Sequence, residues 1–377
     1  MIGYHFKIHV IATSFVASAV ALASAEVYAG SLDEEIGDMT KKLALYLKSK
    51  GETQIAIGQF VGPPQLAASS GPGIVQSFQD HFGRLEIRVA TRANIGLKGE
   101  YTLAKVPSTD EGIGVRIQGS LVDSFGEVLT DFSFQASEKS TPGKIEKIVD
   151  KHEDVVRILG ATTDLHPEDA DADRNRDLKD RIINPSLHLD GTRCAASATS
   201  PYQIEICIDG NPLPVDVRDG LGFVDIQRNQ IYSIRMHNQS EYDAAVRLSI
   251  DGLSIFRFSE LRNPDGQPRY QFYVIPKGQS IELKGWHKTN EKVSSFRVTS
   301  YAESAAASIQ HEQNIGTITA TFSAAWPKDG PRPQDEDTIA KGSGNATGFG
   351  PVVTQLAKEV ERQEGKLRAS ISLRYTR

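Results

Sequence analysis

The feature that most constrains the fold is a change of hydrophobic period near Pro185. After this residue, apolar and polar residues alternate along short segments such as YQIEICID, IYSIRMHN and AAVRLSID. An alternation with a period of two places the apolar side chains on one face of a β-strand. Turn signals, such as DG at 251–252 and NPDG at 263–266, separate the segments. This pattern predicts a C-terminal β-sandwich domain over residues 186–377.

Before Pro185, the apolar residues recur at helical spacings of three and four. A first amphipathic helix is predicted to end at Gly51. Its apolar stripe consists of Leu32, Ile36, Met39, Leu43 and Leu47. Strand-like segments such as TQIAIGQF and IGVRIQGSLVDS follow, with a second helical pattern between them and a closing one that ends at Leu159. We therefore expect an α+β chain whose first domain, residues 30–160, is an α/β sandwich with helices on a mixed sheet.

Two stretches of this first domain resemble known families. They are LALYLKSKGETQIAIGQF, followed by a loop and a helix, and VRIQGSLVDSFGEVL. They resemble the periplasmic α/β domain shared by the curli-secretion lipoprotein family, flagellar outer-membrane lipoprotein families and outer-membrane activators of penicillin-binding proteins. The resemblance covers residues 32–160 and implies envelope assembly or partner binding without catalysis. Residues 186–377 resemble an uncharacterised module of bacterial exported proteins, which implies no activity.

The first 25 residues indicate export. Lys7 precedes an apolar stretch at 10–23, and ASA at 23–25 has the form of a cleavage site, with VYA at 27–29 as a second choice. The apolar stretch is shorter than the roughly 20 residues that a membrane-spanning helix needs. We predict a signal peptide over residues 1–25 and a periplasmic or extracellular mature chain without a transmembrane segment.

The charge balance bears on the class of partner. The chain has 42 Lys and Arg residues against 48 Asp and Glu residues, a net charge of −6. It therefore lacks the overall positive field that attracts nucleic acid or acidic lipid. We expect no nucleic-acid partner.

The two cysteines, Cys194 and Cys207, favour a disulfide, because an even count in an exported chain is typical of paired cysteines. Such a bond would contribute about 3 kcal/mol in the chain-entropy model. Two free thiols and a metal pair are the alternatives, although a metal site would want further Cys or His at close spacing.

An acidic linker is predicted over residues 161–185. Its acidic ladder matches positions 1, 3, 5, 7, 9 and 12 of a calcium-binding loop, and consists of Asp169, Asp171, Asp173, Asn175, Asp177 and Asp180. Arg174 stands where such a loop needs glycine, and neighbouring basic residues offset the negative charge. We therefore prefer a solvated linker or a short exposed helix to a calcium site.

The segment IELKGW at 281–286 raises the question of where Trp286 points. Strict alternation puts its ring on the polar face, whereas a bulge at Gly285 turns it inward. We favour the inward orientation, because an exposed tryptophan needs a cover. The tentative binding surface of this domain consists of Tyr273, Trp286, His287 and Trp326.

The C-terminal region combines three patterns. Residues 327–350 have the Pro, Gly and charge content of a mobile loop, and VVTQLAKEVERQ at 352–363 has a helical pattern. RASISLRYTR alternates and predicts a last strand that returns to a sheet; its apolar face consists of Ala369, Ile371, Leu373 and Tyr375.

Motifs for catalysis are absent from the sequence, which contains no HExxH, GxSxG or CxxC. The loop at 62–73 lacks the Gly-Lys-Ser/Thr end of a phosphate-binding loop and is interpreted as a βα connection. The leading hypothesis is a non-catalytic exported envelope protein, without a cofactor, that binds or assembles an envelope protein or glycan. The alternative is a hydrolase of an unrecognised family, with a cleft between the domains and a Ser/His/Asp set from distant residues.

Overall fold

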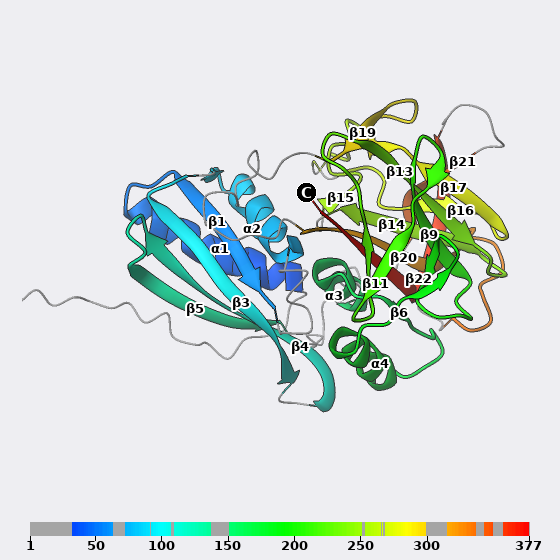
Figure 1. The fold of residues 1–377 in the computed structure, drawn as a ribbon, viewed down its shortest axis with the longest axis horizontal. Helices are drawn as coiled ribbons and strands as arrows, with labels where there is room; N and C mark the ends of the chain where they lie inside the picture. Colours follow the sequence, from blue (N-terminus) through cyan, green and yellow to red (C-terminus); the bar gives the residue numbers. More distant parts are fainter. Residues whose placement is uncertain are drawn as a thin grey trace, which may run out of the picture.

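The chain folds into an N-terminal lobe and a larger β lobe, with two helices between them (Figure 1). The computed structural model describes residues 32–62, 72–90, 92–106, 109–136, 151–250, 253–264, 266, 268–298, 315–336, 343–349 and 357–376. The predicted signal peptide and most of the 62–73 loop lie outside these residues. Within these ranges, no helix is long and apolar enough to cross a membrane.

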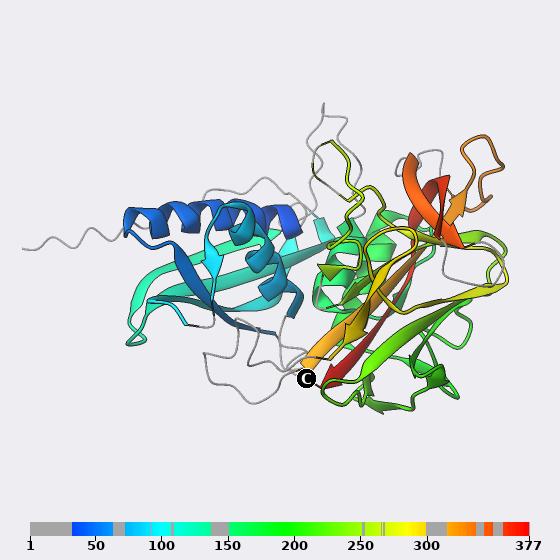
Figure 2. The ribbon, with the colours of Figure 1, turned by 90° about the horizontal axis from the view of Figure 1, so that it is seen from above.

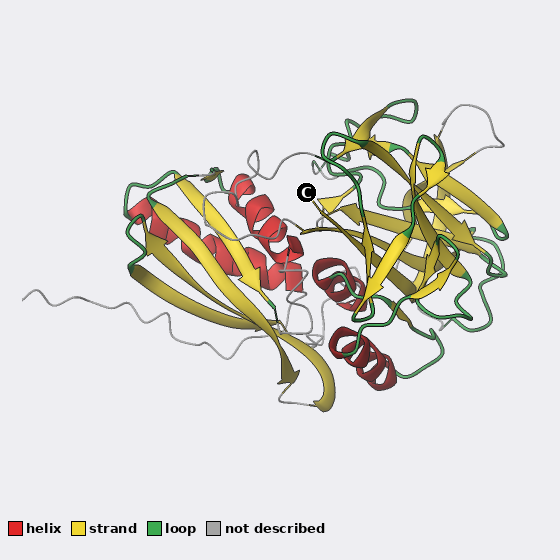
Figure 3. Cartoon of the chain, viewed as in Figure 1, coloured by secondary structure: helices red, strands yellow, loops and turns green. Residues whose placement is uncertain are grey.

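The N-terminal lobe contains a five-stranded mixed sheet in the order β2-β1-β3-β4-β5. Strand β1 is parallel to β2 and β3, while β3, β4 and β5 form antiparallel pairs. The strands are β1 (Gln54–Val61), β2 (Arg88–Val89), β3 (Ile95–Val106), β4 (Thr109–Asp123) and β5 (Val128–Ala136). Helices α1 (Leu32–Ser49) and α2 (Pro72–Arg84) lie side by side on the same side of this sheet (Figure 3).

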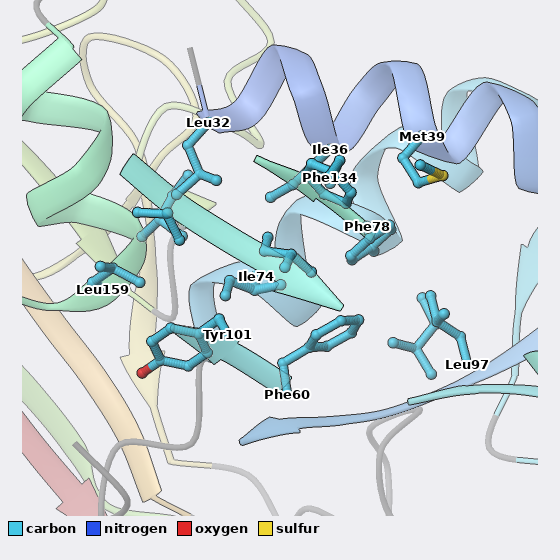
Figure 4. Close-up of a cluster of buried hydrophobic side chains, with 14 of the residues drawn as sticks. Leu32, Ile36, Met39, Phe60, Ile74, Phe78, Leu97, Tyr101, Phe134 and Leu159 are labelled. Carbon is cyan, nitrogen blue, oxygen red and sulfur yellow. The ribbon is translucent and has the colours of Figure 1, made fainter. Parts of the chain in front are cut away.

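The core of this lobe lies between the helices and the sheet (Figure 4). The apolar stripe of α1 is buried, and the ring of Phe78 on α2 stacks on that of Phe60 on β1 with centroids 5.1 Å apart. Leu97 and Tyr101 alternate on β3 toward the core, while Lys98 between them is exposed. The sheet therefore has one covered face and one polar face open to solvent.

The segment between the lobes is a packed connector and not the predicted acidic linker. It consists of α3 (Lys151–Leu159), β6 (Thr163–Asp164) and α4 (Asp171–Ile183). Leu178 and Ile182 of α4 are buried in the core of the N-terminal lobe, and β6 pairs with a strand of the β lobe. The prediction failed because the few apolar residues of an acidic helix are enough to dock one face of it.

The calcium interpretation of the acidic ladder is also not supported. Most of the ladder lies on α4, where side chains two positions apart point about 200° away from each other and cannot converge on one ion. Asp171 and Asp173 lie in the first turn of α4, where negative charge complements the helix dipole. No group of three or more His, Cys, Asp or Glu suited to a metal ion occurs among the described residues.

The β lobe is a sandwich of an eight-stranded and a nine-stranded sheet. The eight-stranded sheet contains β7 (His188–Asp190), β8 (Arg193–Ala195), β9 (Tyr202–Ile208), β10 (Asn211–Pro212), β13 (Ile231–Asn238), β17 (Gln279–Leu283), β18 (Gly285–His287) and β19 (Val293–Arg297). The nine-stranded sheet contains β6, β11 (Val215–Arg218), β12 (Leu221–Val224), β14 (Asp243–Ile250), β15 (Leu253–Ser254), β16 (Tyr273–Ile275), β20 (Ile315–Trp326), β21 (Ser343–Phe349) and β22 (Ala357–Thr376). Apolar side chains from both sheets form one core, in which Tyr202 stacks on Phe322 with centroids 4.8 Å apart.

The last strand, β22, confirms the prediction that the C-terminal segment returns to a sheet. It lies between β12 and β20, and its four predicted core residues are buried. It ends between the two lobes (Figure 2). The predicted terminal helix is wrong for residues 357–363, which pair with β21; this pairing overrides the helical pattern. The predicted mobile loop contains β21 and, at Asp335 and Glu336, ion pairs to β22.

The predicted disulfide is wrong, because both cysteines are free and buried. Cys194 lies opposite Ile204 of β9, whereas Cys207 is three residues further along β9, and so on the opposite face. Three residues of strand span about 10 Å, and a disulfide needs Cα atoms within about 7 Å. Burial raises the pKa of the Cys194 thiol to about 12 and that of Cys207 to about 11.

Candidate functional site

A pocket of about 720 Å³ lies where the connector meets the sandwich. Its walls come from residues 164–168 after β6, one side of α4, the β8–β9 loop at 196–202 and the β13–β14 turn at 239–242, with Asp335 and Arg368 completing it. We call it the junction pocket. The hydrolase hypothesis also placed a site between the domains, but the junction pocket contains no Ser/His pair joined by a hydrogen bond.

Strand β22 positions the connector side of the junction pocket. Asp164 of β6 pairs with Ala369, and the backbone N–H of Leu165 donates to the carbonyl of Arg368 at 2.7 Å. Asp164 in turn accepts hydrogen bonds from Ser197 at 2.6 Å and from Ser200 at 2.7 Å. These hydroxyls tie the β8–β9 loop to the connector, so two segments that are distant in the sequence share one wall.

Arg368 fills another wall, and its charge is already neutralised there. Its Nη1 and Nη2 atoms donate to the two carboxylate oxygens of Asp335 at 2.7 and 2.6 Å, and Nη2 also donates to Glu336 at 3.0 Å. The ring of Tyr242 lies 5.3 Å from the guanidinium carbon. Burial alone would lower the pKa of Arg368, but these carboxylates raise it. Arg368 is thus a structural cation and is not available to an anionic ligand.

Tyr202 also lines the junction pocket. Its side chain is 2% exposed, and its buried hydroxyl makes no hydrogen bond of normal geometry, although Ser240 lies nearby. Burial raises the pKa of Tyr202, so the phenol is protonated at neutral pH. Arg368 and Asp335 are close enough for their charges to affect this pKa, but the hydroxyl oxygen itself is not exposed to the pocket.

The electrostatic character of the junction pocket is acidic. Six carboxylates and two arginines line it, which gives a formal excess of four negative charges. Asp177 on α4 and Glu241 in the β13–β14 turn make no hydrogen bond or ion pair through their side chains with any other described residue. The pocket therefore presents free carboxylates from two of its walls.

A second hollow, of about 730 Å³, lies on the open face of the five-stranded sheet. Lys98, Glu100 and Gln118 line it, and Ser120 donates to Asp131 across the strands at 2.6 Å. We call it the sheet-face hollow. None of its lining side chains has a buried polar atom without a partner.

A polar network on the eight-stranded sheet has the order of groups found in a catalytic triad. Ser280 Oγ lies 2.6 Å from His237 Nδ1, and His237 Nε2 lies 3.0 Å from Glu205 Oε2. Thr192 donates to the other oxygen of Glu205 at 2.5 Å. Burial lowers the pKa of His237 and keeps the ring neutral. Neither hollow includes Ser280, and the network lies on three neighbouring strands of the sandwich, not between the lobes.

The tentative binding surface predicted from the sequence is corrected by the structure. Tyr273, His287 and Trp326 are 3%, 1% and 4% exposed, and only Trp286 reaches the surface. Trp286 is half-buried, with its ring edge-on to that of Phe258 at 5.1 Å, so neither of its two predicted orientations holds completely. Tyr273 and Trp326 failed because β16 and β20 are covered on both faces, and His287 failed because it lies on the buried face of β18.

The residues of the junction pocket were missed by the sequence analysis. Asp164, Tyr202 and Arg368 come from three distant segments, and no short motif joins them. The local signal was the Ser197 and Ser200 pair before β9, which is indistinguishable from ordinary turn residues. No protein-family model, curated protein or solved structure matches this chain.

Proposed function

We propose that this protein is a non-catalytic exported envelope protein that binds a partner protein in the junction pocket. The observation that carries this proposal is the junction pocket itself, a hollow of about 720 Å³ whose walls come from the connector and from loops of the sandwich. The pocket volume also falls within the usual range for ligand sites.

The support for a preformed site comes from the way the connector is fixed. Arg174 of α4 donates to the carbonyl of Leu367 at 2.7 Å, and Arg374 of β22 donates to that of Gly160 at 2.7 Å. Both arginines are 1% exposed. The connector is thus held to β22 at two places, which lowers the entropy cost of ordering the site when a partner binds.

The location and the kind of partner rest on the sequence. The predicted signal peptide supports export, and the resemblance of residues 32–160 to envelope lipoprotein families supports an assembly or docking role. A site that binds a segment of a partner protein is consistent with export and with an assembly or docking role.

The test is affinity capture from a cell-envelope extract with matched variants. Gln239→Trp places a large ring in the junction pocket, and Gln118→Trp makes the same change in the sheet-face hollow; both glutamines are exposed. We expect wild type and Gln118→Trp to capture the same protein and Gln239→Trp to lose it. Capture that survives Gln239→Trp, or that is lost equally in both variants, contradicts the proposal.

The Ser280, His237 and Glu205 network is the one observation that favours the alternative, a hydrolase. A fluorophosphonate probe tests it, because the probe reacts with a serine that a histidine activates. We expect no labelling of the native protein. Labelling of Ser280 that disappears in His237→Ala would establish the hydrolase and overturn the non-catalytic proposal.

A further inference from the structure

We propose that the free edge of β5 pairs with β5 of a second copy of this chain, which joins two five-stranded sheets into one ten-stranded sheet. Strand β5 lies at the end of its sheet and at the margin of the N-terminal lobe (Figure 1). Its backbone pairs with β4 on one side, and no other described strand pairs with it. The junction pocket contains no residue of β5, so this pairing goes beyond the proposed function.

Strand β5 lacks several features that commonly protect an edge strand. Every second residue of an edge strand directs its backbone N–H and C=O away from the sheet, where they can pair with another strand. Short strands, lysine and proline commonly prevent such pairing. The edge strands β7, β11 and β18 have three, four and three residues. By contrast, β5 has nine residues with no Lys, Arg or Pro among them, and Val128 and Leu129 at its start are exposed.

The sequence of β5 allows it to pair with itself without opposing like charges. A twofold axis places the two strands antiparallel, and directly opposite residues then lie on the same face of the joined sheet. Complete overlap puts the central residue, Phe132, opposite itself and Asp131 opposite Ser133 of the second copy. Asp131 is the only charged residue of β5, and both Asp131 and Ser133 are exposed on the open face. A β-bulge at Leu129 lies outside these central residues, where the register with β4 is regular.

The helix that packs on β5 supplies complementary charges for the same arrangement. Helix α2 packs on β1 and α1 packs on β5. Asp33 of α1 accepts a hydrogen bond from Ser77 of α2 at 2.5 Å, so this flank of α1 faces α2. At about 100° per residue, Glu35 and Lys42 lie on the opposite flank, two turns apart. The twofold axis places the two α1 helices antiparallel, so Glu35 of one copy lies toward Lys42 of the other.

The first measurement is the mass of the full-length chain in solution, by sedimentation velocity over a concentration series from micromolar to near-millimolar. A strand pair and one helix flank make a small interface, so we expect a reversible dimer rather than an obligate one. The weight-average mass should rise with concentration toward twice that of one chain. The mass of a single chain at every concentration would overturn the proposal. A mass that grows beyond two copies would also overturn it, because a twofold contact between two edges closes.

Charge variants of β5 test the edge and its register together. Ser133→Asp places a carboxylate opposite Asp131 of the second copy, and the axis creates this repulsion twice. We expect about tenfold weaker association, because like charges directly opposite destabilise a strand pair. Asp131→Lys/Ser133→Asp converts both contacts into pairs of opposite charge and should recover association to within about threefold of wild type.

The matched control lies on another edge strand. Val217 of β11 is 38% exposed, and Val217→Asp adds the same charge outside the β5 edge. We expect it to change association by less than about twofold. Equal weakening by Ser133→Asp and Val217→Asp would overturn the proposal, as would a double variant that associates no better than Ser133→Asp. A thermal melt of each variant confirms that it is folded before association is compared.

Discussion

The five-stranded sheet and the nine-stranded sheet differ in what covers their polar faces. On β3 of the N-terminal lobe, the polar face carries Lys98 and is open to solvent. On β22, the polar face is buried as completely as the apolar one, with Ser370, Ser372 and Arg374 at 0%, 0% and 1% exposure. The connector covers this second face. Alternation in a sequence therefore identifies a strand but does not reveal whether its polar side meets water or protein.

The connector is held over this face of β22 by hydrogen bonds from the strand to the connector. Ser370 donates to the carbonyl of Ala161 at 2.8 Å, and the backbone N–H of Ser372 donates to the Thr162 hydroxyl at 3.0 Å. Burial lowers the pKa of Arg374 to about 10, and the side chain stays charged at neutral pH. Arg368 belongs to the same face and lines the junction pocket, so the pocket lies at the edge of the covered face.

The largest loss of stability on the covered polar face is expected from a substitution of Arg247 of β14. Arg247 donates to both carboxylate oxygens of Glu364 and lies 3.3 Å from Glu153, and these carboxylates belong to residues that are 4% and 9% exposed. Arg247→Ala leaves both buried carboxylates without their guanidinium, and we expect a loss of about 3–5 kcal/mol of unfolding free energy. Urea denaturation measures it. Lys98→Ala on the open face is the control, and its unfolding free energy should lie within about 0.5 kcal/mol of wild type. Similar losses in the two variants would contradict the difference between the covered and the open face.

The outer face of the eight-stranded sheet is intermediate between the covered and the open polar faces, because its polar side chains bind one another. The pH dependence of stability tests this face. Burial alone would raise the pKa of Glu205, but hydrogen bonds from Thr192 and His237 and the charge of Arg235 lower it. Its stabilisation is therefore present above the ordinary glutamate pKa of about 4.3 and is lost as pH falls through the lowered folded value. We expect Glu205→Gln to cost about 2 kcal/mol at pH 7. The difference in unfolding free energy between wild type and Glu205→Gln should shrink below pH 4. A difference that stays constant with pH would contradict a stabilising role for the charged Glu205.

A pair of serines gives the mildest mutational comparison of the covered and open faces. Ser370→Ala removes a buried hydrogen bond to Ala161 and should cost about 1 kcal/mol, since Ser372 also donates to that carbonyl at 3.3 Å. Ser120→Ala removes an exposed bond to Asp131 and should change stability by less than about 0.5 kcal/mol. A larger loss at Ser120 than at Ser370 would reverse the comparison.

Reduction of the protein is expected to have no effect on its stability. Cys194 and Cys207 lie on opposite faces of one sheet, and their thiols are free and buried. Dithiothreitol should leave the denaturation midpoint unchanged. Thiol titration of native protein should find neither group reactive, and titration of unreduced, denatured protein should find both. A midpoint that falls on reduction would mean that the two cysteines are bonded.

The fold class could be predicted from the hydrophobic period, because the spacing of apolar residues determines which face of a helix or strand packs in the core. The last strand is the clearest example: Ile371 and Leu373 alternate toward the sandwich core as predicted. The connector was missed for a physical reason. Leu178 and Ile182 are the only buried apolar residues in a charged helix. Arg174 is buried and donates to a carbonyl 193 positions away, a contact that no local sequence pattern indicates.

The candidate site was less predictable than the fold. The sequence favoured aromatic residues such as Trp326, yet its ring is buried and its Nε1 atom donates to Gln363 at 2.8 Å. The junction pocket depends instead on the pairing of β6 with β22, which brings Asp164 beside Arg368. Contacts of this range are set by the tertiary fold, so their residues carry no sequence signature.

The measurement that most directly tests the cover on β22 is amide hydrogen exchange of the native full-length chain, followed by mass spectrometry. A packed connector predicts that peptides from α4 and β6 exchange nearly as slowly as those from β22, because they open only with the sandwich or the N-terminal core. Exchange of α4 within seconds, while β22 stays protected, would mean that the connector is a solvated linker. The polar face of β22 and the junction pocket would then lack their cover.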